Sequence, residues 1–137
     1  MPRSNTSLRT FLKDLGIEGN GAKDDVIYQG GPLELGRPFV VHTSDYTIEG
    51  TNVGLAGLAV TVKRDVFHAI AAGKGPRRFL VALGRAGWGA GQLERELSAG
   101  VWVVVMADEG LVFEPDNDKK WDRAFDRGAH PALYARR

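Results

Sequence analysis

A glycine-rich run, LGRAGWGAGQLERE at residues 83–96, contains residue types that could bind a phosphate. It lies between an apolar stretch and a helical pattern, and free N–H groups at the start of a helix attract anions. The run nevertheless matches neither common phosphate motif. A Walker loop ends in Gly-Lys-Ser/Thr, and the dinucleotide pattern that would begin at Gly87 has Gln92 where its third glycine belongs. A site for a small anion or nucleotide at Gly87–Gly91 is therefore kept only as the alternative.

The charges around this turn also favour a structural role. Glu94 and Glu96 fall in the first two turns of the expected helix, where they complement its positive end and would repel a phosphate. Arg85 could offset them, and Asp108 lies about where a ribose-binding acid would be expected. We interpret the run as a strand-to-helix joint whose glycines allow a sharp turn and let Trp88 pack against the sheet.

The same run also predicts a contact surface. Tryptophan and arginine are frequent anchors of protein interfaces, and this joint carries one of each. The candidate binding surface consists of Arg85, Trp88, Gln92 and Glu96. The expected partner is another protein.

Elsewhere the sequence offers no cluster that favours catalysis. The HTSD stretch at residues 42–45 has the residue types of a hydrolase triad, but neighbouring strand residues point to opposite faces and do not easily converge on one atom. A histidine that hydrogen-bonds into a turn is the favoured interpretation. The three histidines lack metal-ligand spacing, the chain has no cysteine, and Asp116 and Asp118 are typical of helix capping. We therefore expect no enzyme activity, no cofactor and no metal.

The overall charge gives no general attraction to nucleic acid or to an anionic membrane. The 137 residues carry 18 basic and 17 acidic side chains, for a net charge of +1. Five basic residues could still form a weak DNA-binding patch at one end of the sheet, although nucleic acid is a disfavoured partner. They are Lys63, Arg64, Lys74, Arg77 and Arg78. The longest apolar run, Val101–Ala107, is far too short to span a membrane, so a cytoplasmic protein without a membrane partner is expected.

Hydrophobic periodicity predicts an α+β fold with a mixed sheet flanked by short helices. The expected helices are 7–15, 65–72, 91–99 and 116–127, and the expected strands are 26–28, 39–43, 58–62, 78–83 and 101–106, with 46–48 as a further edge strand. The strands at 26–28 and 39–43 are expected to be neighbours in the sheet. Residues 58–83 and 79–106 are each predicted to form a strand–helix–strand unit with parallel strands. A doubly wound α/β fold is the alternative. We expect one compact domain over residues 1–128 and a loose basic tail at 129–137.

The sequence resembles the YqgE/AlgH family of small bacterial proteins. The resemblance covers roughly residues 7–127 and depends most on the long central run at 83–94. The other matching features are YQGGP at 28–32, VVHT at 40–43, the Arg64-Asp65 helix start, Gly75-Pro76, Trp102, Asp108, Phe113 and Trp121.

This resemblance implies a compact α+β fold, a bacterial cytoplasm, no established reaction and no required cofactor. Most family members are of uncharacterised function, and some are described as candidate transcriptional regulators. Arg85 stands where the family usually has tyrosine. Members also carry an additional N-terminal segment with an early strand pair, so we expect this sequence to be either truncated at its start or a shortened member. We expect the lack of that segment to expose a sheet edge and apolar surface, which favours self-association or lowers stability. The leading hypothesis is a non-enzymatic binding or regulatory module.

Overall fold

The computed structural model describes residues 1–19 and 23–129. They divide into two compact units, residues 1–85 and the residues from 86 onward. Among the described residues, no helix is long and apolar enough to cross a membrane. The predicted tail at 129–137 lies outside the described residues except for Ala129, which ends the last helix. The single domain expected over 1–128 stays a prediction.

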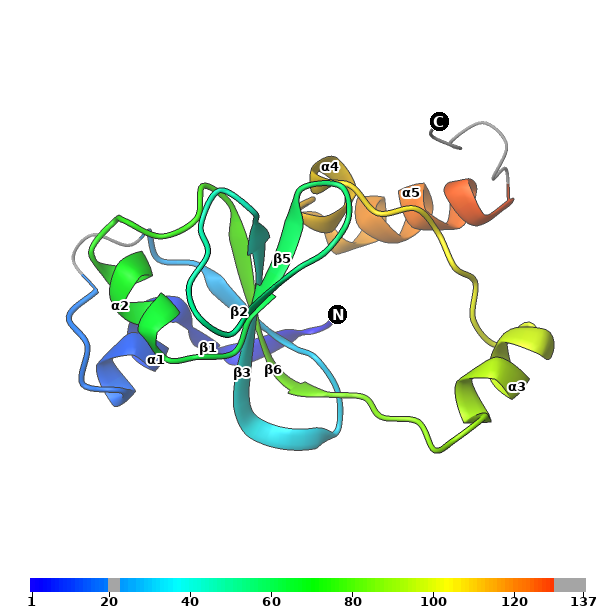
Figure 1. Ribbon diagram of the computed structural model, residues 1–137, viewed down its shortest axis with the longest axis horizontal. Helices are drawn as coiled ribbons and strands as arrows, with labels where there is room; N and C mark the ends of the chain where they lie inside the picture. Colours follow the sequence, from blue (N-terminus) through cyan, green and yellow to red (C-terminus); the bar gives the residue numbers. More distant parts are fainter. Residues whose placement is uncertain (20–22, 130–137) are drawn as a thin grey trace. The chain divides into compact units, whose positions relative to one another are not determined.

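The first unit is built on a six-stranded mixed sheet (Figure 1). Its strands are β1 (Arg3–Ser7), β2 (Val26–Gln29), β3 (Leu33–Thr43), β4 (Thr51–Val53), β5 (Leu58–Thr61) and β6 (Phe79–Arg85). They lie in the order β1-β2-β6-β3-β5-β4. β2 and β6 are parallel, whereas the other neighbouring pairs are antiparallel. The predicted α+β class with a mixed sheet is therefore confirmed, and the doubly wound alternative is not the fold.

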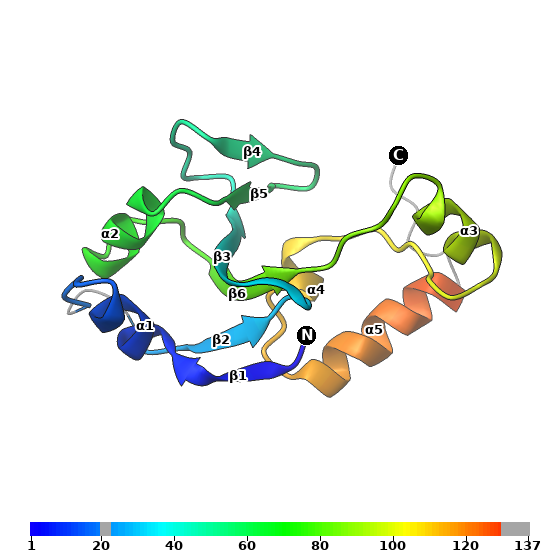
Figure 2. The same ribbon diagram turned by 90° about the horizontal axis from the view of Figure 1, so that it is seen from below.

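Two helices, α1 (Leu8–Asp14) and α2 (Asp65–Ala71), lie side by side on one side of this sheet (Figures 1 and 2). Ser7 caps α1, and its hydroxyl accepts the N–H of Thr10. The rings of Phe11 and Phe67 meet edge-on, with centroids 5.2 Å apart, and join the two helices. The buried core is formed by side chains of these helices and of the sheet. It consists of Leu8, Leu12, Ile27, Val40, Val66, Phe67, Ile70, Ala71 and Val81.

β6 lies in the middle of the sheet because it is apolar on both faces. Leu80, Val81 and Ala82 are all buried, as the lack of alternation predicts. β6 consequently separates β2 from β3, and the prediction that these two strands are neighbours is wrong. The turn at 30–32 carries the chain past the end of β6, where the N–H of Gly30 donates to the carbonyl oxygen of Leu83 at 2.7 Å.

The connection from β5 through α2 to β6 forms the predicted parallel crossover. Both strands are antiparallel to β3, which lies between them, so they run in the same direction. The edge strand expected at 46–48 is wrong, because the edge is formed by β4, which begins at Thr51. The opposite edge, β1, was not predicted because its polar residues show no apolar alternation and pair with β2 through the backbone.

The second unit contains α3 (Gln92–Ser98), α4 (Glu109–Val112) and α5 (Asn117–Ala129), so the helices predicted at 91–99 and 116–127 are confirmed. The strand predicted at 101–106 is wrong, and with it the strand–helix–strand unit at 79–106. Val101 and Val104 are 62% and 79% exposed. A strand needs a neighbour for its backbone, and Val103–Val105 form no backbone hydrogen bond with another described residue.

Candidate functional site

Three of the four predicted surface residues meet in one cluster. We call Trp88, Gln92, Glu96 and Trp102 the tryptophan cluster. Gly91 precedes α3 with a φ of +75°, a conformation that glycine adopts readily. Gln92 and Glu96 are four residues apart and therefore lie on one side of α3. Trp88 precedes α3 in the sequence and Trp102 follows it, so the segments on both sides of the helix contribute an indole to Glu96.

Glu96 is the centre of the cluster because three side chains donate hydrogen bonds to its carboxylate. The indole Nε1–H of Trp102 donates to Oε2 at 2.6 Å, and the indole Nε1–H of Trp88 donates to the same oxygen at 3.1 Å. The amide of Gln92 donates to Oε1 at 3.0 Å. These bonds, with that of Trp102 the largest cause, hold the pKa of Glu96 below its usual value. The carboxylate is therefore ionised at neutral pH.

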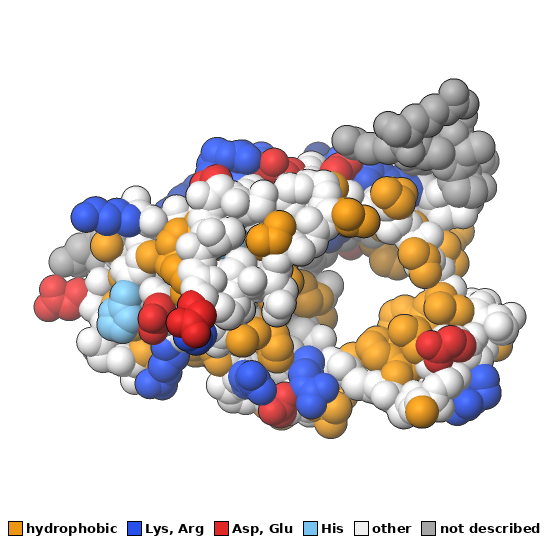
Figure 3. All heavy atoms as spheres, viewed as in Figure 1, with side chains coloured by type: hydrophobic (Ala, Val, Ile, Leu, Met, Phe, Trp, Pro, Cys, Tyr) orange, Lys and Arg blue, Asp and Glu red, His pale blue; other side chains and the backbone are white. Residues whose placement is uncertain are grey.

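The two indole rings are held in place without being buried. Their centroids are 6.0 Å apart and their planes are inclined by 77°, an edge-to-face arrangement. Trp88 is 40% exposed and Trp102 is 50% exposed. Figure 3 shows hydrophobic side chains gathered around α3, with acidic atoms among them. Sequence reasoning missed Trp102 because the VWVVVM stretch around it is typical of a buried strand.

Arg85, the fourth predicted surface residue, ends β6 in the first unit and forms an ion pair there. Its guanidinium donates from Nε to Oε2 of Glu34. This bond is the main reason why the pKa of Glu34 lies below its usual value. Arg37 adds a weaker contact with the other carboxylate oxygen at 3.4 Å. A role for Arg85 in binding a partner stays a prediction.

The Gly87–Gly91 turn uses one of its own N–H groups inside the protein. The N–H of Gly89 donates to Oε1 of Gln92 at 3.0 Å, and the N–H of Gln92 donates to the carbonyl oxygen of Gly89 at the same distance. An anion in the turn would have to displace this amide oxygen. α3 is also only seven residues long, so few peptide dipoles add up at its start. The geometry gives the alternative of an anion or nucleotide site no support.

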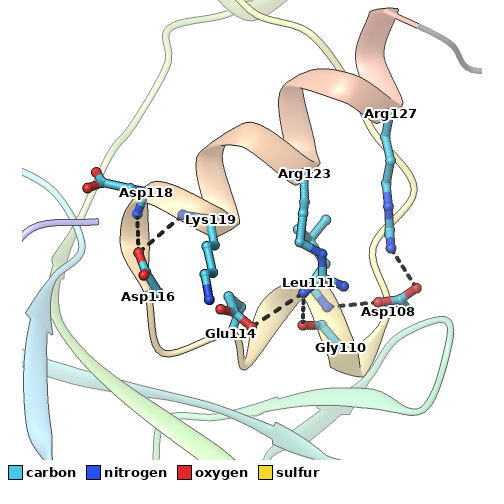
Figure 4. A network of polar contacts seen from close by, with 9 residues as sticks. All are labelled: Asp108, Gly110, Leu111, Glu114, Asp116, Asp118, Lys119, Arg123 and Arg127. Atoms are coloured by element: carbon cyan, nitrogen blue, oxygen red, sulfur yellow. Dashed lines mark hydrogen bonds and ion pairs between the residues drawn. The ribbon is translucent and has the colours of Figure 1, made fainter.

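Two aspartates that could have been ligands cap helices instead (Figure 4). Asp108 accepts the N–H of Leu111 at 2.8 Å at the start of α4, and its other oxygen accepts from Arg127 at 3.0 Å. Asp116 accepts two backbone N–H groups at the start of α5, at 3.0 and 3.2 Å. The capping prediction is confirmed at Asp116. The placement of Asp108 as a ribose-binding acid is wrong, because it required a strand at 101–106.

His42 is fully buried and has a hydrogen-bond partner on each ring nitrogen. Nδ1 lies 2.8 Å from the carbonyl oxygen of Thr43, which can only accept, so Nδ1 carries the proton. In the neutral ring with this tautomer, Nε2, 2.8 Å from Oγ1 of Thr61, accepts from that hydroxyl. Asp45 accepts a hydrogen bond from the Thr43 hydroxyl rather than from the histidine. The histidine does form hydrogen bonds as predicted, but its partners are Thr43 of β3 and Thr61 of β5 rather than a turn. Residues 42–45 form no hydrolase triad.

The basic residues considered for DNA binding belong to the first unit. Nζ of Lys63 lies 3.9 Å from Oε2 of Glu49. The backbone N–H of Arg77 donates to Oδ2 of Asp45 at 3.0 Å. His68 is exposed, as its helical position predicts. In the part of the chain that the structure describes, no group of three or more His, Cys, Asp or Glu could hold a metal ion.

Comparison with known proteins points to one family. The sequence pattern of the AlgH-like family matches residues 2–131. A UPF0301 protein of Rhodospirillum rubrum is 51% identical over 131 residues, which cover 94% of this chain and 68% of that protein. The chain spans between 60% and 70% of the length of this and other curated relatives that it matches. None of these names states an activity.

Two solved structures share the fold. The solution structure of the AlgH protein from Pseudomonas aeruginosa gives a TM-score of 0.76 at 34% identity and covers 99% of this chain and 74% of that one. The crystal structure of a protein from Corynebacterium diphtheriae gives a TM-score of 0.74 at 21% identity, over 99% of this chain and 72% of that one, and shows the fold alone. Because the family pattern extends over nearly the whole sequence, the chain belongs to the AlgH-like family.

Proposed function

We propose that this protein is a non-enzymatic binding module that takes a protein partner on the tryptophan cluster. The observation that carries the proposal is the pair of half-exposed indoles held by a single carboxylate oxygen. Tryptophan is among the residues that most often dominate binding at interfaces. A regulatory role, including one in transcription, would act through this partner.

The hydrogen bonds of the cluster support binding because they reduce its cost. A flexible side chain loses conformational freedom when a partner fixes it, at about 0.5–1.5 kcal/mol for each rotamer-rich side chain. The Nε1–H groups of Trp88 and Trp102 are already bound to Glu96 in the free protein. A partner would therefore meet rings that are already oriented.

The non-enzymatic part of the proposal is supported by how the candidate catalytic histidine and the candidate ligand-binding aspartate are used. Both ring nitrogens of His42 are engaged inside the core, and the carboxylate of Asp108 is divided between a helix cap and an arginine. Groups that hold structure in this way are not available to a substrate.

We expect Trp88→Ala to weaken partner binding about tenfold or more, since truncating a central aromatic anchor removes its contact area. The 137-residue chain would carry an affinity tag and capture proteins from a bacterial lysate, with quantification by mass spectrometry. Arg85→Ala tests whether this residue contributes as well.

Leu55→Ala is the matched control, because Leu55 is 83% exposed on a loop of the first unit. A captured protein that is lost with Trp88→Ala and retained with Leu55→Ala supports the proposed surface. Equal capture by native protein and Trp88→Ala contradicts it.

We also propose that the chain self-associates, with residues 101–106 as the contact. Their side chains are apolar throughout, and the backbone of Val103–Val105 lacks strand partners among the described residues. In an antiparallel pair of two copies centred on this segment, Val103 of one copy would face Val104 of the other. The sheet edges expected from the sequence are shorter contacts, because β4 has three residues and β1 has five.

Val104→Lys is expected to weaken self-association about tenfold, because a charge on an exposed strand edge opposes pairing. Sedimentation velocity over a range of concentrations measures this change. Val53→Lys is the control at the sheet edge, where Val53 is 61% exposed. Monomeric native protein, or a loss of association with Val53→Lys alone, contradicts the proposed contact.

A further inference from the structure

The geometry of the tryptophan cluster determines which part of each indole is available to a ligand. An indole N–H lies in the plane of its ring, and both N–H groups point at Oε2 of Glu96. The positive ring edges are therefore turned toward the carboxylate. The ring faces carry the negative part of the aromatic quadrupole, and the two side chains remain 40% and 50% exposed.

Glu96 adds a full negative charge at the same place. Its three donors, Trp88, Trp102 and Gln92, are neutral, so they stabilise the carboxylate without cancelling its charge. No described lysine or arginine forms an ion pair with Glu96. Negative aromatic faces and an unneutralised carboxylate thus occur together, and both attract a cation.

We infer that the tryptophan cluster binds a positively charged side chain of the protein partner, an arginine in preference to a lysine. This inference rests on the proposed function and names the chemistry of the partner. A planar guanidinium can stack on an indole face while its N–H groups reach toward the carboxylate. Such contacts form when the cation lies within about 6 Å of the ring centroid.

Other partner chemistries match the cluster less well. An aliphatic side chain placed over the indoles would remove water from Glu96 and supply no opposite charge, which is unfavourable. A carboxylate or phosphate would be repelled by the same group. A basic side chain is the partner group that satisfies both the ring faces and the carboxylate.

The test uses the indole N–H signals of the 137-residue, nitrogen-15-labelled chain in solution. The chain has three tryptophans, and the third, Trp121, lies on α5 next to Asp122. Trp121 therefore reports any unspecific attraction of a cation to an acidic helix. The probes are end-blocked tripeptides Gly-Arg-Gly, Gly-Leu-Gly and Gly-Glu-Gly at equal ionic strength. We expect the arginine peptide to shift the signals of Trp88 and Trp102 saturably and to leave that of Trp121 unchanged.

Glu96→Gln is expected to weaken arginine-peptide binding about fivefold, as the loss of one nearby unit charge would at a hydrated surface. Glu94→Gln is the matched control on the same helix and should change binding less than twofold. Because Glu96→Gln could disturb the cluster, a second measurement uses native protein: added sodium chloride should weaken binding of the arginine peptide. Salt-independent binding, equal shifts with the leucine peptide, or an equal shift of Trp121 would overturn the inference.

Failure of this inference can be separated from failure of the proposed function. If Trp88→Ala loses a captured protein while the arginine peptide moves neither cluster signal, the partner is not recognised through a cation and the inference is overturned. If capture is unaffected by Trp88→Ala, the proposed function itself fails.

Discussion

Gly84→Ala should destabilise the first unit by about 3 kcal/mol or more, the largest loss we expect from adding one methyl group to this chain. Gly84 has a φ of +78°, where side chains are strained. A Cβ at this position would also lie 2.4 Å from the carbonyl oxygen of Gly31 and 3.0 Å from that of Leu33. Both are backbone atoms, so the clash can be relieved only by moving the turn itself.

This close approach explains why two glycine-containing segments that are distant in the sequence, the turn at 30–32 and the end of β6 at Gly84, are in contact in the structure. The turn between β2 and β3 passes the end of β6, where β2 and β3 lie on opposite sides of that strand. A Cβ on Gly30 would in turn lie 2.3 Å from the carbonyl oxygen of Gly84. The two backbones thus require glycine on both sides of the contact.

Gly16→Ala separates conformational strain from this contact. Gly16 has nearly the same φ, +76°, but a Cβ there would meet nothing within 4 Å. We expect it to cost only about 1 kcal/mol, the penalty of the left-handed conformation alone. Urea unfolding followed by circular dichroism compares the two variants. Equal losses would show that the approach of Gly30 and Gly31 to Gly84 has no energetic weight.

The glycine contact shows what sequence reasoning could and could not supply. Four glycines close together predict special backbone geometry, and the joint after β6 was predicted correctly. The residue that faces Gly84, Gly31, lies more than fifty positions earlier, and local patterns carry no information about that pairing. The same limit explains why β2 and β3 were expected to be neighbours.

The segment 101–106 shows a different limit. A run of valines with a tryptophan and a methionine indicates a preference for burial between two layers. It does not indicate which segment would cover it, and in the second unit most of these side chains are exposed. The pattern was therefore a sound indicator of strand propensity and a poor indicator of the fold.

The sequence predicted the members of the tryptophan cluster that lie close together in the chain, but not Trp102. Gln92 and Glu96 are related by helical spacing, and Trp88 lies a few residues before them, so their meeting follows from short-range geometry. Trp102 completes the site from beyond the end of α3. Its role depended on where the chain turns after Gly100, which periodicity does not determine.

His42→Phe is expected to cost about 2–3 kcal/mol, because it removes hydrogen bonds from the core while keeping a ring of similar shape. The Thr43 carbonyl would lose the donor that now lies 2.8 Å away, and the Thr61 hydroxyl would lose its acceptor. Thr61 also contacts the hydroxyl of Thr51 at 2.8 Å, so the bonds of His42 continue across β3, β5 and β4. Urea unfolding at neutral pH measures the loss.

A double-mutant cycle with Thr61→Val tests whether the loss comes from the hydrogen bond. Thr61→Val removes the hydroxyl that His42→Phe leaves without its acceptor, so the double variant should lose about 1 kcal/mol less than the sum of the single variants. Additive losses would mean that the two side chains do not depend on each other. A catalytic histidine can usually be replaced with little cost in stability, whereas His42 links β3 to β5 and, through Thr61, to β4. We therefore expect replacement of His42 to lower the free energy of unfolding.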